Sequence, residues 1–294
     1  MEFFYKSSDI TLIQGDSLEV LPKLTSSSVD LIFADPPYFL SNGGLTCKAG
    51  KFASVNKADW DRSNGLEKDF AFTERWIREC RRVLKESGSI WVSGTMHNIY
   101  QVGFALQRAG FRILNEVIWF KPNAPPNLSG KYFTHSHETL IWARKTTSVP
   151  HYFDYPSMRR WHDDFSPSGK QMRSVWSIPA TPSSEKICGK HPTQKPLQLL
   201  LRIITASTPP DALILDPFAG SGTTLLASKL LGRRCIGIER VGRYLQIALK
   251  RIKSINDISL SQYNGYSNTQ IRKMGGRKVS SARAVRPSFS ETVQ

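Results

Sequence analysis

Asp35-Pro36-Pro37-Tyr38 and Asp216-Pro217-Phe218-Ala219-Gly220-Ser221-Gly222-Thr223-Thr224 are the two stretches that decide the fold. Each follows an apolar run, residues 29–34 before the first and 212–215 before the second. Such runs indicate buried strands of a parallel sheet. Ligands of α/β proteins bind at the carboxyl ends of parallel strands. The two turns therefore predict a cofactor crevice beside a pocket for a flat group that carries an amine.

Strand and helix patterns alternate along the rest of the chain. Further strands are expected over residues 10–13, 90–92, 111–120, 138–143 and 235–238. Periodicity predicts helices over residues 18–24, 70–84, 99–108, 196–207, 223–231 and 244–252, with residues 86–89 ending the second of them. Prolines follow residue 120, so the strands before and after them are expected to form an antiparallel hairpin near a sheet edge. The pattern predicts an α/β fold with a doubly wound, mostly parallel sheet.

Three segments interrupt this pattern. Residues 41–64 form a loop that is long for a compact domain, which is typical of a functional or disordered loop. Residues 146–189 alternate aromatic with basic residues, and we interpret them as an inserted recognition segment, with a structural lid as the alternative. Beyond about residue 256 the composition predicts disorder. The expected units are a catalytic half (1–145), the insert (146–189), a cofactor-binding half (190–255) and a basic tail (256–294).

The charge of the chain is the strongest signal in its composition. The formal net charge is +16, and the residues from Lys229 onward hold 14 Lys and Arg against three acids. Such a surplus favours a polyphosphate partner, namely DNA, over an acidic membrane or a merely solvated tail. No apolar run is long enough for a membrane span, and no signal peptide is recognisable, so a cytoplasmic location without membrane contact is expected. The four cysteines lack CxxC spacing, and neither a disulfide framework nor a metal site is expected.

The glycine-rich turn indicates a nucleoside cofactor. Gly220-Ser221-Gly222 alone is weak evidence, because many α/β proteins have such a turn between a strand and a helix. Glu239 strengthens it, because it ends the next strand at a spacing that suits hydrogen bonds to ribose hydroxyls. The turn lacks the third glycine of a dinucleotide site and the Gly-Lys-Thr of a phosphate-binding loop. A nucleoside cofactor without a pyrophosphate fits best.

The Asp35-Pro36-Pro37-Tyr38 turn indicates the chemistry. Two prolines fix the backbone and remove two N–H donors, so their carbonyls can accept from an exocyclic amine. Asp35 can accept from the same amine, and Tyr38 can stack on a planar ring. A rigid turn without function is the alternative, but the apolar strand directly before the turn argues against it.

These motifs resemble the S-adenosylmethionine-dependent DNA methyltransferases that methylate exocyclic amines. Their order, with the DPPY motif first and the glycine-rich motif late, matches the permuted beta class. The resemblance covers residues 10 to about 252 and implies a Rossmann-like, permuted methyltransferase fold. Three further stretches carry it: Gly15-Asp16-Ser17, residues 115–121 followed by His137-Glu138-Thr139-Leu140-Ile141-Trp142-Ala143, and His191-Pro192-Thr193-Gln194-Lys195-Pro196. Residues 39–44 and 125–142 look most similar to bacterial adenine-N6 enzymes of restriction–modification and cell-cycle type, whose sites are GATC or GANTC. The long C-terminal domain of the cell-cycle members is absent.

The resemblance also implies roles for individual residues. Glu239 would hold the ribose of the cofactor, Asp16 would lie near its adenine, and residues 191–196 would close over its methionine end. The catalytic group would receive the target base and consists of Asp35, Pro36, Pro37 and Tyr38. The cofactor-binding group consists of Asp16, Ser17, Asp35, His191, Thr193, Gln194, Lys195, Asp216, Phe218, Ala219, Gly220, Ser221, Gly222, Thr223, Thr224, Glu239 and Arg240.

The expected function is methyl transfer from S-adenosylmethionine to the N6 amine of adenine in a short DNA sequence. The target base would be extruded into the pocket, and its amine would attack the sulfonium methyl directly. Methylation of cytosine N4 is the nearer alternative, since the same pocket could support it. A non-catalytic nucleic-acid binder is the more distant one. The sequence leaves open whether the DNA is single- or double-stranded and whether the protein is a monomer or a homodimer.

Overall fold

A nine-stranded sheet organises the described part of the chain. The computed structural model describes residues 2–41, 45–48, 51–54, 59–127 and 129–254, so the expected disordered tail lies outside the described residues. The strand order is β1-β2-β11-β10-β3-β6-β8-β7-β9. The strands are β1 (Phe3–Lys6), β2 (Ile10–Gln14), β3 (Val29–Ala34), β6 (Leu84–Gly94), β7 (Arg112–Phe120), β8 (His137–Arg144), β9 (Val175–Ser177), β10 (Leu213–Asp216) and β11 (Arg234–Glu239). The five from β2 to β6 in this order are mutually parallel.

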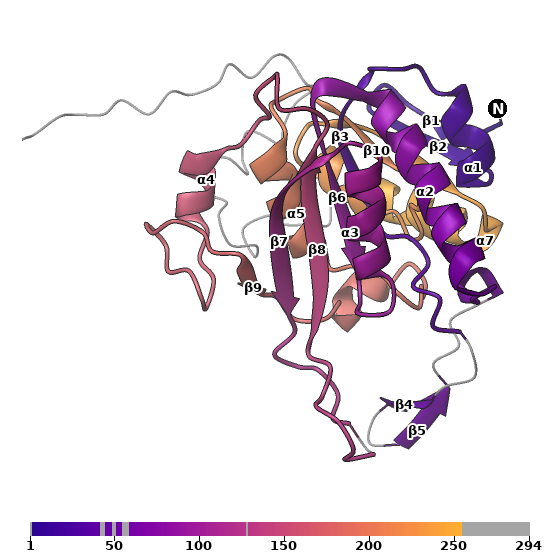
Figure 1. Ribbon diagram of the computed structural model, residues 1–294, viewed down its shortest axis with the longest axis vertical. Helices are drawn as coiled ribbons and strands as arrows, with labels where there is room; N and C mark the ends of the chain where they lie inside the picture. The colour runs from indigo at the N-terminus through magenta and orange to yellow at the C-terminus, as the bar shows by residue number, and fades with distance from the viewer. Residues whose placement is uncertain (1, 42–44, 49–50, 55–58, 128, 255–294) are drawn as a thin grey trace, which may run out of the picture.

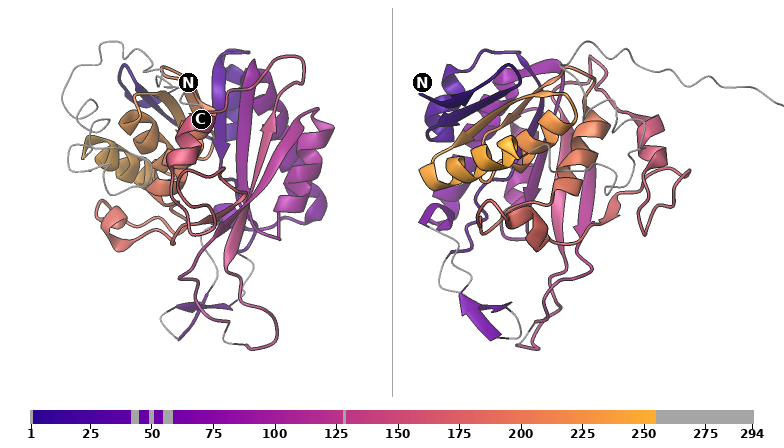
Figure 2. Two further views of the ribbon diagram at one scale, coloured as in Figure 1. Left: turned by 90° about the vertical axis from the view of Figure 1, so that its left-hand side faces the viewer. Right: turned by 180° about the vertical axis from the view of Figure 1, so that it is seen from behind.

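Helices cover both faces of the sheet, which confirms the doubly wound α/β fold (Figures 1 and 2). One face carries α1 (Ser17–Val20), α2 (Leu66–Val83) and α3 (Ile99–Arg108). The opposite face carries α5 (Leu197–Ser207), α6 (Thr223–Leu230) and α7 (Gly242–Lys253), with α4 (Tyr155–Arg160) packed beside α5. Short 3₁₀ turns are η1 (Leu21–Lys23), η2 (Asp59–Asp61) and η3 (Ser183–Lys186).

The side chains of β3 show how the sheet separates two cores. Leu31 and Phe33 point to the core that includes α5, α6 and α7. Ile32 and Ala34 point to the core that includes α2 and α3. Because successive side chains of a strand point to opposite faces, an uninterrupted apolar run is what a strand between two helical layers requires.

The pairing of β3 with β10 brings the two motifs together. Leu31 lies opposite Ile214, and Ile32 lies opposite Leu215, in a parallel register. The turns that follow the two strands therefore leave the sheet at the same edge, although they are far apart in the sequence. This arrangement confirms the expected permuted order of the fold.

Several local expectations were wrong. The hairpin of β7 and β8 is antiparallel as expected, but β9 pairs with β7 and forms the edge of the sheet instead. The helix expected over residues 70–84 begins at Leu66, and residues 86–89 belong to β6 because that strand extends back to Leu84. Strand β1 has no counterpart in the expectations.

The segment over residues 146–189 is less irregular than expected. It contains α4, β9 and η3, and its side chains Trp161 and Trp176 are buried in the main core. Arg202 of α5, which is fully buried, forms an ion pair of 2.7 Å with Asp163 of this segment. The guanidinium lies 5.1 Å and 5.0 Å from the ring centres of Trp161 and Trp176. The segment is therefore joined to the core through its aromatic residues.

Two projections extend from the end of the sheet at which β3 and β6 finish (Figure 1). One is the two-stranded hairpin of β4 (Leu45–Lys48) and β5 (Lys51–Ser54). The other is the connection between β7 and β8, over residues 121–136, where Phe133 is 97% exposed. Among the described residues, no helix combines the length and apolar character needed to cross a bilayer.

Candidate active site

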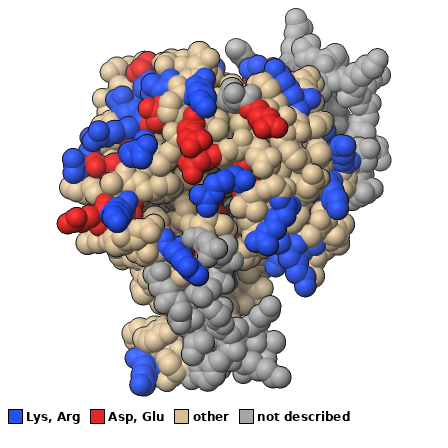
Figure 3. All heavy atoms as spheres, turned by 90° about the vertical axis from the view of Figure 1, so that its right-hand side faces the viewer, with Lys and Arg blue, Asp and Glu red and all other residues tan. Residues whose placement is uncertain are grey.

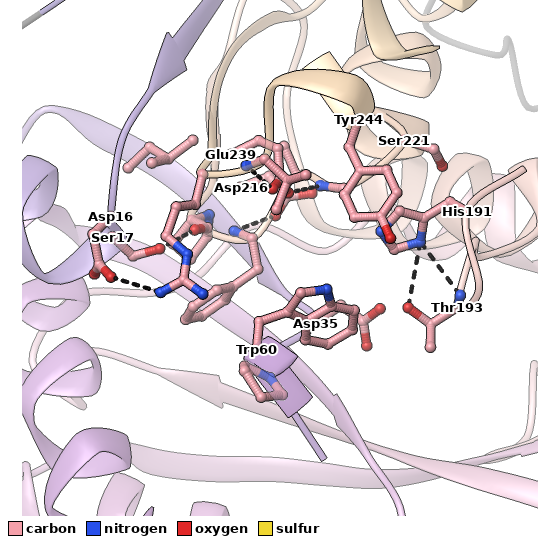
Figure 4. Close-up of a pocket in the computed structure, with 18 of the residues that line it drawn as sticks. Asp16, Ser17, Asp35, Trp60, His191, Thr193, Asp216, Ser221, Glu239 and Tyr244 are labelled. Carbon is pink, nitrogen blue, oxygen red and sulfur yellow. Dashed lines mark hydrogen bonds and ion pairs between the residues drawn. The ribbon is translucent and has the colours of Figure 1, made fainter. Parts of the chain in front are cut away.

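A cavity of about 350 Å³ opens where β2, β3, β10 and β11 end. Figure 4 shows Asp216 and Glu239 beside each other on one wall, with His191 and Tyr244 next to them and Asp35 and Trp60 facing them. Both sequence motifs therefore border one space. Its lining includes most of the residues expected at the cofactor: Asp16, Ser17, Asp35, His191, Thr193, Gln194, Lys195, Asp216, Phe218, Ala219, Gly220, Ser221, Thr223, Thr224, Glu239 and Arg240.

Glycine is required at two positions of the turn after β10. Gly220 and Gly222 have φ angles of +51° and +74°, which side chains rarely adopt. A Cβ at Gly220 would lie 3.1 Å from Nε2 of His191, on the cavity wall. A Cβ at Gly222 would lie 2.7 Å from that of Ala248 in α7. Gly220 therefore lets the His191 ring pack against the turn at the cavity wall, whereas Gly222 allows α7 to pack and does not line the cavity.

Arg251 of α7 supports the glycine-rich turn, a role that the sequence did not predict. It is 4% exposed, and its Nη1 donates to the carbonyl oxygen of Ser221 and to Oγ1 of Thr223, both at 2.8 Å. Buried guanidinium groups need such partners. The sequence gave no signal for this role, because Arg251 lies on a helix whose other basic residues suit a solvated face.

Two acids on neighbouring strands form the polar wall. Glu239 accepts the backbone N–H of Gly220 at 2.9 Å and of Val241 at 2.7 Å, and burial raises its pKa. Asp216 accepts the backbone N–H of Phe218 at 3.0 Å, and burial raises its pKa to about 7. The first of these hydrogen bonds fixes Glu239 against the glycine-rich turn, so its carboxylate faces the cavity at a defined place.

The start of α1 closes another part of the cavity. Asp16 caps that helix by accepting the N–H of Leu18 at 2.8 Å, and Arg240 lies 3.6 Å from its second carboxylate oxygen. Ser17 donates to the carbonyl of Pro217 and so joins the end of β2 to the turn after β10. Asp16 therefore lines the cavity, and its place near the adenine of the cofactor stays a prediction.

His191 belongs to an aromatic group at the cavity wall. Its ring packs edge-on against Tyr244 at 4.1 Å between centres and lies nearly parallel to Trp60 at 6.2 Å. Burial, helped by the positive charges of Lys195, Arg243 and Arg251, lowers its pKa to about 3. His191 is therefore neutral at physiological pH, and its Nδ1 accepts the N–H of Thr193 at 3.3 Å. These contacts describe a structural group and not a general base.

Asp35 lies at the end of β3 with both carboxylate oxygens engaged. Its Oδ1 accepts the hydroxyl of Tyr38 at 2.8 Å and that of Ser93 at 2.5 Å. Its Oδ2 accepts Nζ of Lys195 at 2.5 Å. Lys195 also lies over the Tyr38 ring, at 5.2 Å from its centre. The Tyr38 side chain is 7% exposed and does not line the cavity, so in this structure it holds Asp35 instead of presenting a free ring.

A second carboxylate, Glu138 of β8, lies behind Asp35. It accepts the Tyr38 hydroxyl at 2.9 Å and Nζ of Lys121 at 2.5 Å, and Nζ of Lys195 lies 3.5 Å away. Burial alone would raise the pKa of Glu138, but Lys195 and Lys121 outweigh it and lower the pKa to about 2. Two carboxylates and two ammonium groups thus alternate through the site.

Asp61 fixes the backbone after the catalytic turn. Its carboxylate accepts the N–H groups of Tyr38 at 2.8 Å, Phe39 at 2.9 Å and Leu40 at 3.3 Å, and the hydroxyl of Ser41 at 3.0 Å. Phe39 has a φ of +59°, which is unusual for a non-glycine residue. The 41–64 loop therefore reaches back through Asp61 and holds the turn in a strained shape.

Sequence reasoning missed the residues that support the motifs. Ser93, Asp61 and Arg251 carry no motif of their own, and Lys121 ended a matching stretch but had no assigned role. Glu138 was part of a matching stretch but had no assigned role. Of the expected catalytic residues, Asp35 and Pro37 line the cavity, whereas Pro36 and Tyr38 do not.

The comparisons with known proteins agree with this geometry. The sequence matches the DNA methylase family N6_N4_Mtase over residues 29–250. The chain belongs to this family. The DNA methylase is 51% identical to the Type II methyltransferase M2.LlaDCHI of Lactococcus lactis subsp. cremoris over 250 residues, covering 85% of this chain and 91% of the relative. It is 49% identical to the Type II methyltransferase M2.DpnII of Streptococcus pneumoniae, covering 86% and 93%.

A solved structure supports the same conclusion. The M1.HpyAVI complex with S-adenosylmethionine is 28% identical, has a TM-score of 0.62, and is matched over 83% of this chain and 98% of its own. The DNA methylase is thus an enzyme of the DNA methyltransferase class, and its cofactor is S-adenosylmethionine. The cavity fits this cofactor, because Glu239 offers acceptor oxygens beside a lining that includes the aromatic side chains of Trp60 and Tyr244.

Proposed function

We propose that this DNA methylase transfers a methyl group to the exocyclic N6 amine of an adenine within a short DNA sequence. The observation that carries the proposal is the place of Asp35. It ends β3 beside β10 and lines the same cavity as the glycine-rich turn and Glu239. A carboxylate is thereby set next to the space for a nucleoside cofactor, as methyl transfer to an amine requires.

The residues of the catalytic turn suit the amine of an extruded base. S-adenosylmethionine supplies an electrophilic methyl group on its sulfonium. Asp35 accepts a hydrogen bond from the amine and draws electron density onto its nitrogen. Pro37 also lines the cavity, and its carbonyl, to which Asn98 donates at 3.3 Å, is a further acceptor beside Asp35. Tyr38 and Ser93 keep the carboxylate in one orientation, and such positioning supplies much of the rate.

Adenine is favoured over cytosine by the chemistry of the first position of the turn. Asp35 gives a full carboxylate, and enzymes that resemble this chain and act on adenine carry an acid before the two prolines. The family includes both N6 and N4 specificities in its name, so cytosine N4 stays the alternative outcome of the test.

The DNA is proposed to lie against the edge at which the two projections leave the sheet. Lys and Arg side chains are spread over the face in Figure 3 with fewer acids among them, in keeping with the net charge of +16. In the 146–189 segment, Arg159 donates to the carbonyl of Gly169 at 2.8 Å, whereas Gln171 and Arg173 are exposed. We assign base readout to Gln171 and Arg173 first, with Arg159, Arg160 and Lys170 as further candidates. We propose that the protein meets this DNA in the cytoplasm.

Nucleoside analysis tests the proposal directly. The protein is incubated with methyl-labelled cofactor and DNA, and the digested DNA is analysed for N6-methyladenine and N4-methylcytosine by mass spectrometry. Label in methylcytosine alone would overturn the base assignment. Cofactor binding without label would leave a non-catalytic binder. Mapping the methylated positions gives the sequence, with GATC and GANTC as the expected candidates, and sedimentation with and without DNA decides between monomer and homodimer.

The Asp35→Ala variant tests the role of the carboxylate. We expect kcat to fall at least ~10²-fold because a positioned acceptor is lost, while calorimetry still detects cofactor binding. Glu116→Ala, at an exposed position of β7, is the control for loss of an acid. An Asp35→Ala variant that keeps more than a tenth of the wild-type kcat would exclude this role.

A further inference from the structure

We propose that Lys195 exchanges between Asp35 and Glu138, and that Glu138 is the positioning residue that releases Asp35 for the target amine. The proposal rests on the proposed function, in which Asp35 accepts that amine. It concerns a residue on β8 that the motifs leave without a role.

The first step of the argument is that Asp35 is occupied. Tyr38 and Ser93 donate to its Oδ1, and Lys195 donates to its Oδ2 at 2.5 Å. Because Oδ1 already has two donors, the amine of a base must bond to Oδ2, the oxygen that Lys195 holds. Lys195 is the donor that competes most strongly, because ion-paired hydrogen bonds are stronger than neutral ones.

The second step is that Lys195 needs a carboxylate partner at its buried site. Its side chain is 6% exposed, and an unpaired ammonium at such a site is costly. Glu138 provides the alternative partner, since its Oε2 already lies 3.5 Å from Nζ of Lys195. A small rotation of the lysine side chain would therefore exchange one carboxylate for the other within the same enclosed space.

The third step is that Tyr38 connects the two carboxylates. Its hydroxyl lies 2.8 Å from Oδ1 of Asp35 and 2.9 Å from Oε2 of Glu138, and a hydroxyl donates only one proton. When Lys195 moves to Glu138, the Tyr38 hydroxyl can keep donating its hydrogen bond to Asp35, and this bond keeps the carboxylate oriented. Lys121, at 2.5 Å from Oε1, binds the other oxygen of Glu138 and leaves Oε2 for the exchange.

The Glu138→Gln variant separates this role from a structural one. The amide keeps the size of the side chain but removes the charge, so Lys195 stays on Asp35. At saturating cofactor and DNA we expect the single-turnover methylation rate to fall about tenfold or more at pH 7.5, because the acceptor of the amine stays blocked. Cofactor affinity is expected to stay within about threefold, because the lysine keeps one carboxylate and the cavity wall is unchanged.

The pH profile of this variant is the decisive readout. The titratable groups that face Lys195 are Asp35 and Tyr38 after β3, Glu138 on β8, and His191 in the preceding segment; Lys121 acts through Glu138. Burial lowers the pKa of Lys195, but Asp35 and Glu138 outweigh it and raise the pKa. Without Glu138 the lysine loses its proton at a lower pH. We therefore expect the rate of Glu138→Gln relative to wild type to recover as pH rises from 8 to 10.

The outcomes distinguish the two proposals. Methylation of adenine by the wild type and an inactive Asp35→Ala variant would support the proposed function. If Glu138→Gln then has the wild-type rate, or a reduced rate with no recovery at high pH, Lys195 does not exchange between the two carboxylates, while the proposed function stands. If wild type produces no N6-methyladenine, the function itself fails. Should Glu138→Gln not fold, Glu138→Asp decides. Aspartate keeps the negative charge, but its shorter side chain places the carboxylate farther from Lys195. A lower methylation rate with the wild-type pH profile would support the exchange of Lys195 between the carboxylates, and an unchanged rate would contradict it.

Discussion

Replacing Asp61 by asparagine should loosen the catalytic turn while leaving the glycine-rich turn and Glu239 in place. Asp61 is 2% exposed, and its carboxylate accepts hydrogen bonds from three backbone N–H groups and one hydroxyl. Asparagine keeps one acceptor oxygen, which can serve Tyr38 and Phe39. Its NH₂ group would face the N–H of Leu40, where no acceptor would remain.

The magnitude follows from these contacts. Hydrogen bonds to a charged group contribute about 1.5–3 kcal/mol, and neutral ones about 0.5–1.5 kcal/mol. Weakening two bonds and losing the one to Leu40 should lower the free energy of unfolding by about 3 kcal/mol. In a domain of this size that corresponds to a Tm lower by about 6–12 °C. The positive φ of Phe39 loses its support, so kcat should fall by about tenfold or more.

Thermal denaturation, calorimetry with the cofactor and methyl transfer are measured on the same preparations. Glu116→Gln, which removes an exposed negative charge from β7, is the matched control and should resemble wild type. Cofactor affinity should change little, since the glycine-rich turn and Glu239 make no contact with the Asp61 carboxylate among its hydrogen bonds. A Tm within 2 °C of wild type together with an unchanged kcat would refute the view that Asp61 holds the turn.

Three further substitutions test other parts of the structure. Gly220→Val should weaken cofactor binding at least about tenfold in calorimetry, because its Cβ would lie 3.1 Å from the His191 ring. Gly232→Val is the control, since Gly232 has a similar φ of +68° but open space around it, and this variant should bind the cofactor normally. Equal losses of affinity in the two variants would show that backbone strain alone is responsible. Asp163→Asn leaves Arg202 buried without its charged partner, and the free energy of unfolding measured in urea should fall by about 3–5 kcal/mol. Adding Arg202→Met should restore part of this loss. Losses that simply add in the double variant would contradict an interaction between the two side chains. Burial raises the pKa of Asp216 to about 7, so the folded state holds this proton to higher pH than the unfolded state and loses stability as pH rises from about 4 to 7. Asp216→Asn should therefore stabilise the cofactor-free protein more at pH 8 than at pH 5. An equal gain in stability at both pH values would argue against ionisation of Asp216 as its cause.

The parts of the fold that were predictable are those with a local signal. Apolar runs that end in a polar or glycine-rich turn located β3 and β10, and the spacing of Glu239 located the end of β11. Strand β9 was missed because only three residues pair there, and Trp176 stands in a segment where aromatic and basic residues alternate. Its tryptophan is core because β9 completes the sheet beside β7, which is a tertiary fact.

The site divides in the same way. Asp35, Asp216 and Glu239 face the cavity directly after strands, and a motif or a spacing marks each of them, so the sequence revealed them; Trp60, Phe72 and Tyr244 also line the cavity but carry no such signal. Ser93 and Lys195 hold Asp35, and Glu138 shares Lys195 with it. These residues come from β6, the segment before α5 and β8, and only the sheet brings them together. Hydrogen bonds between distant segments leave no periodicity, and for this reason Tyr38 was expected to stack on a base when its hydroxyl in fact connects two carboxylates.

The order of strands also has a consequence for how the protein is made. Strand β3 is synthesised early, but its parallel neighbour β10 emerges only after more than two thirds of the chain. Until then one edge of β3 and the apolar side chains that α5 and α6 will cover have no partner, and nascent chains in this condition are prone to aggregate. Pairing between such distant segments also slows folding. Methylating capacity should therefore appear only when β10, β11 and α7 have left the ribosome and docked, so products that end before β10 should not modify DNA.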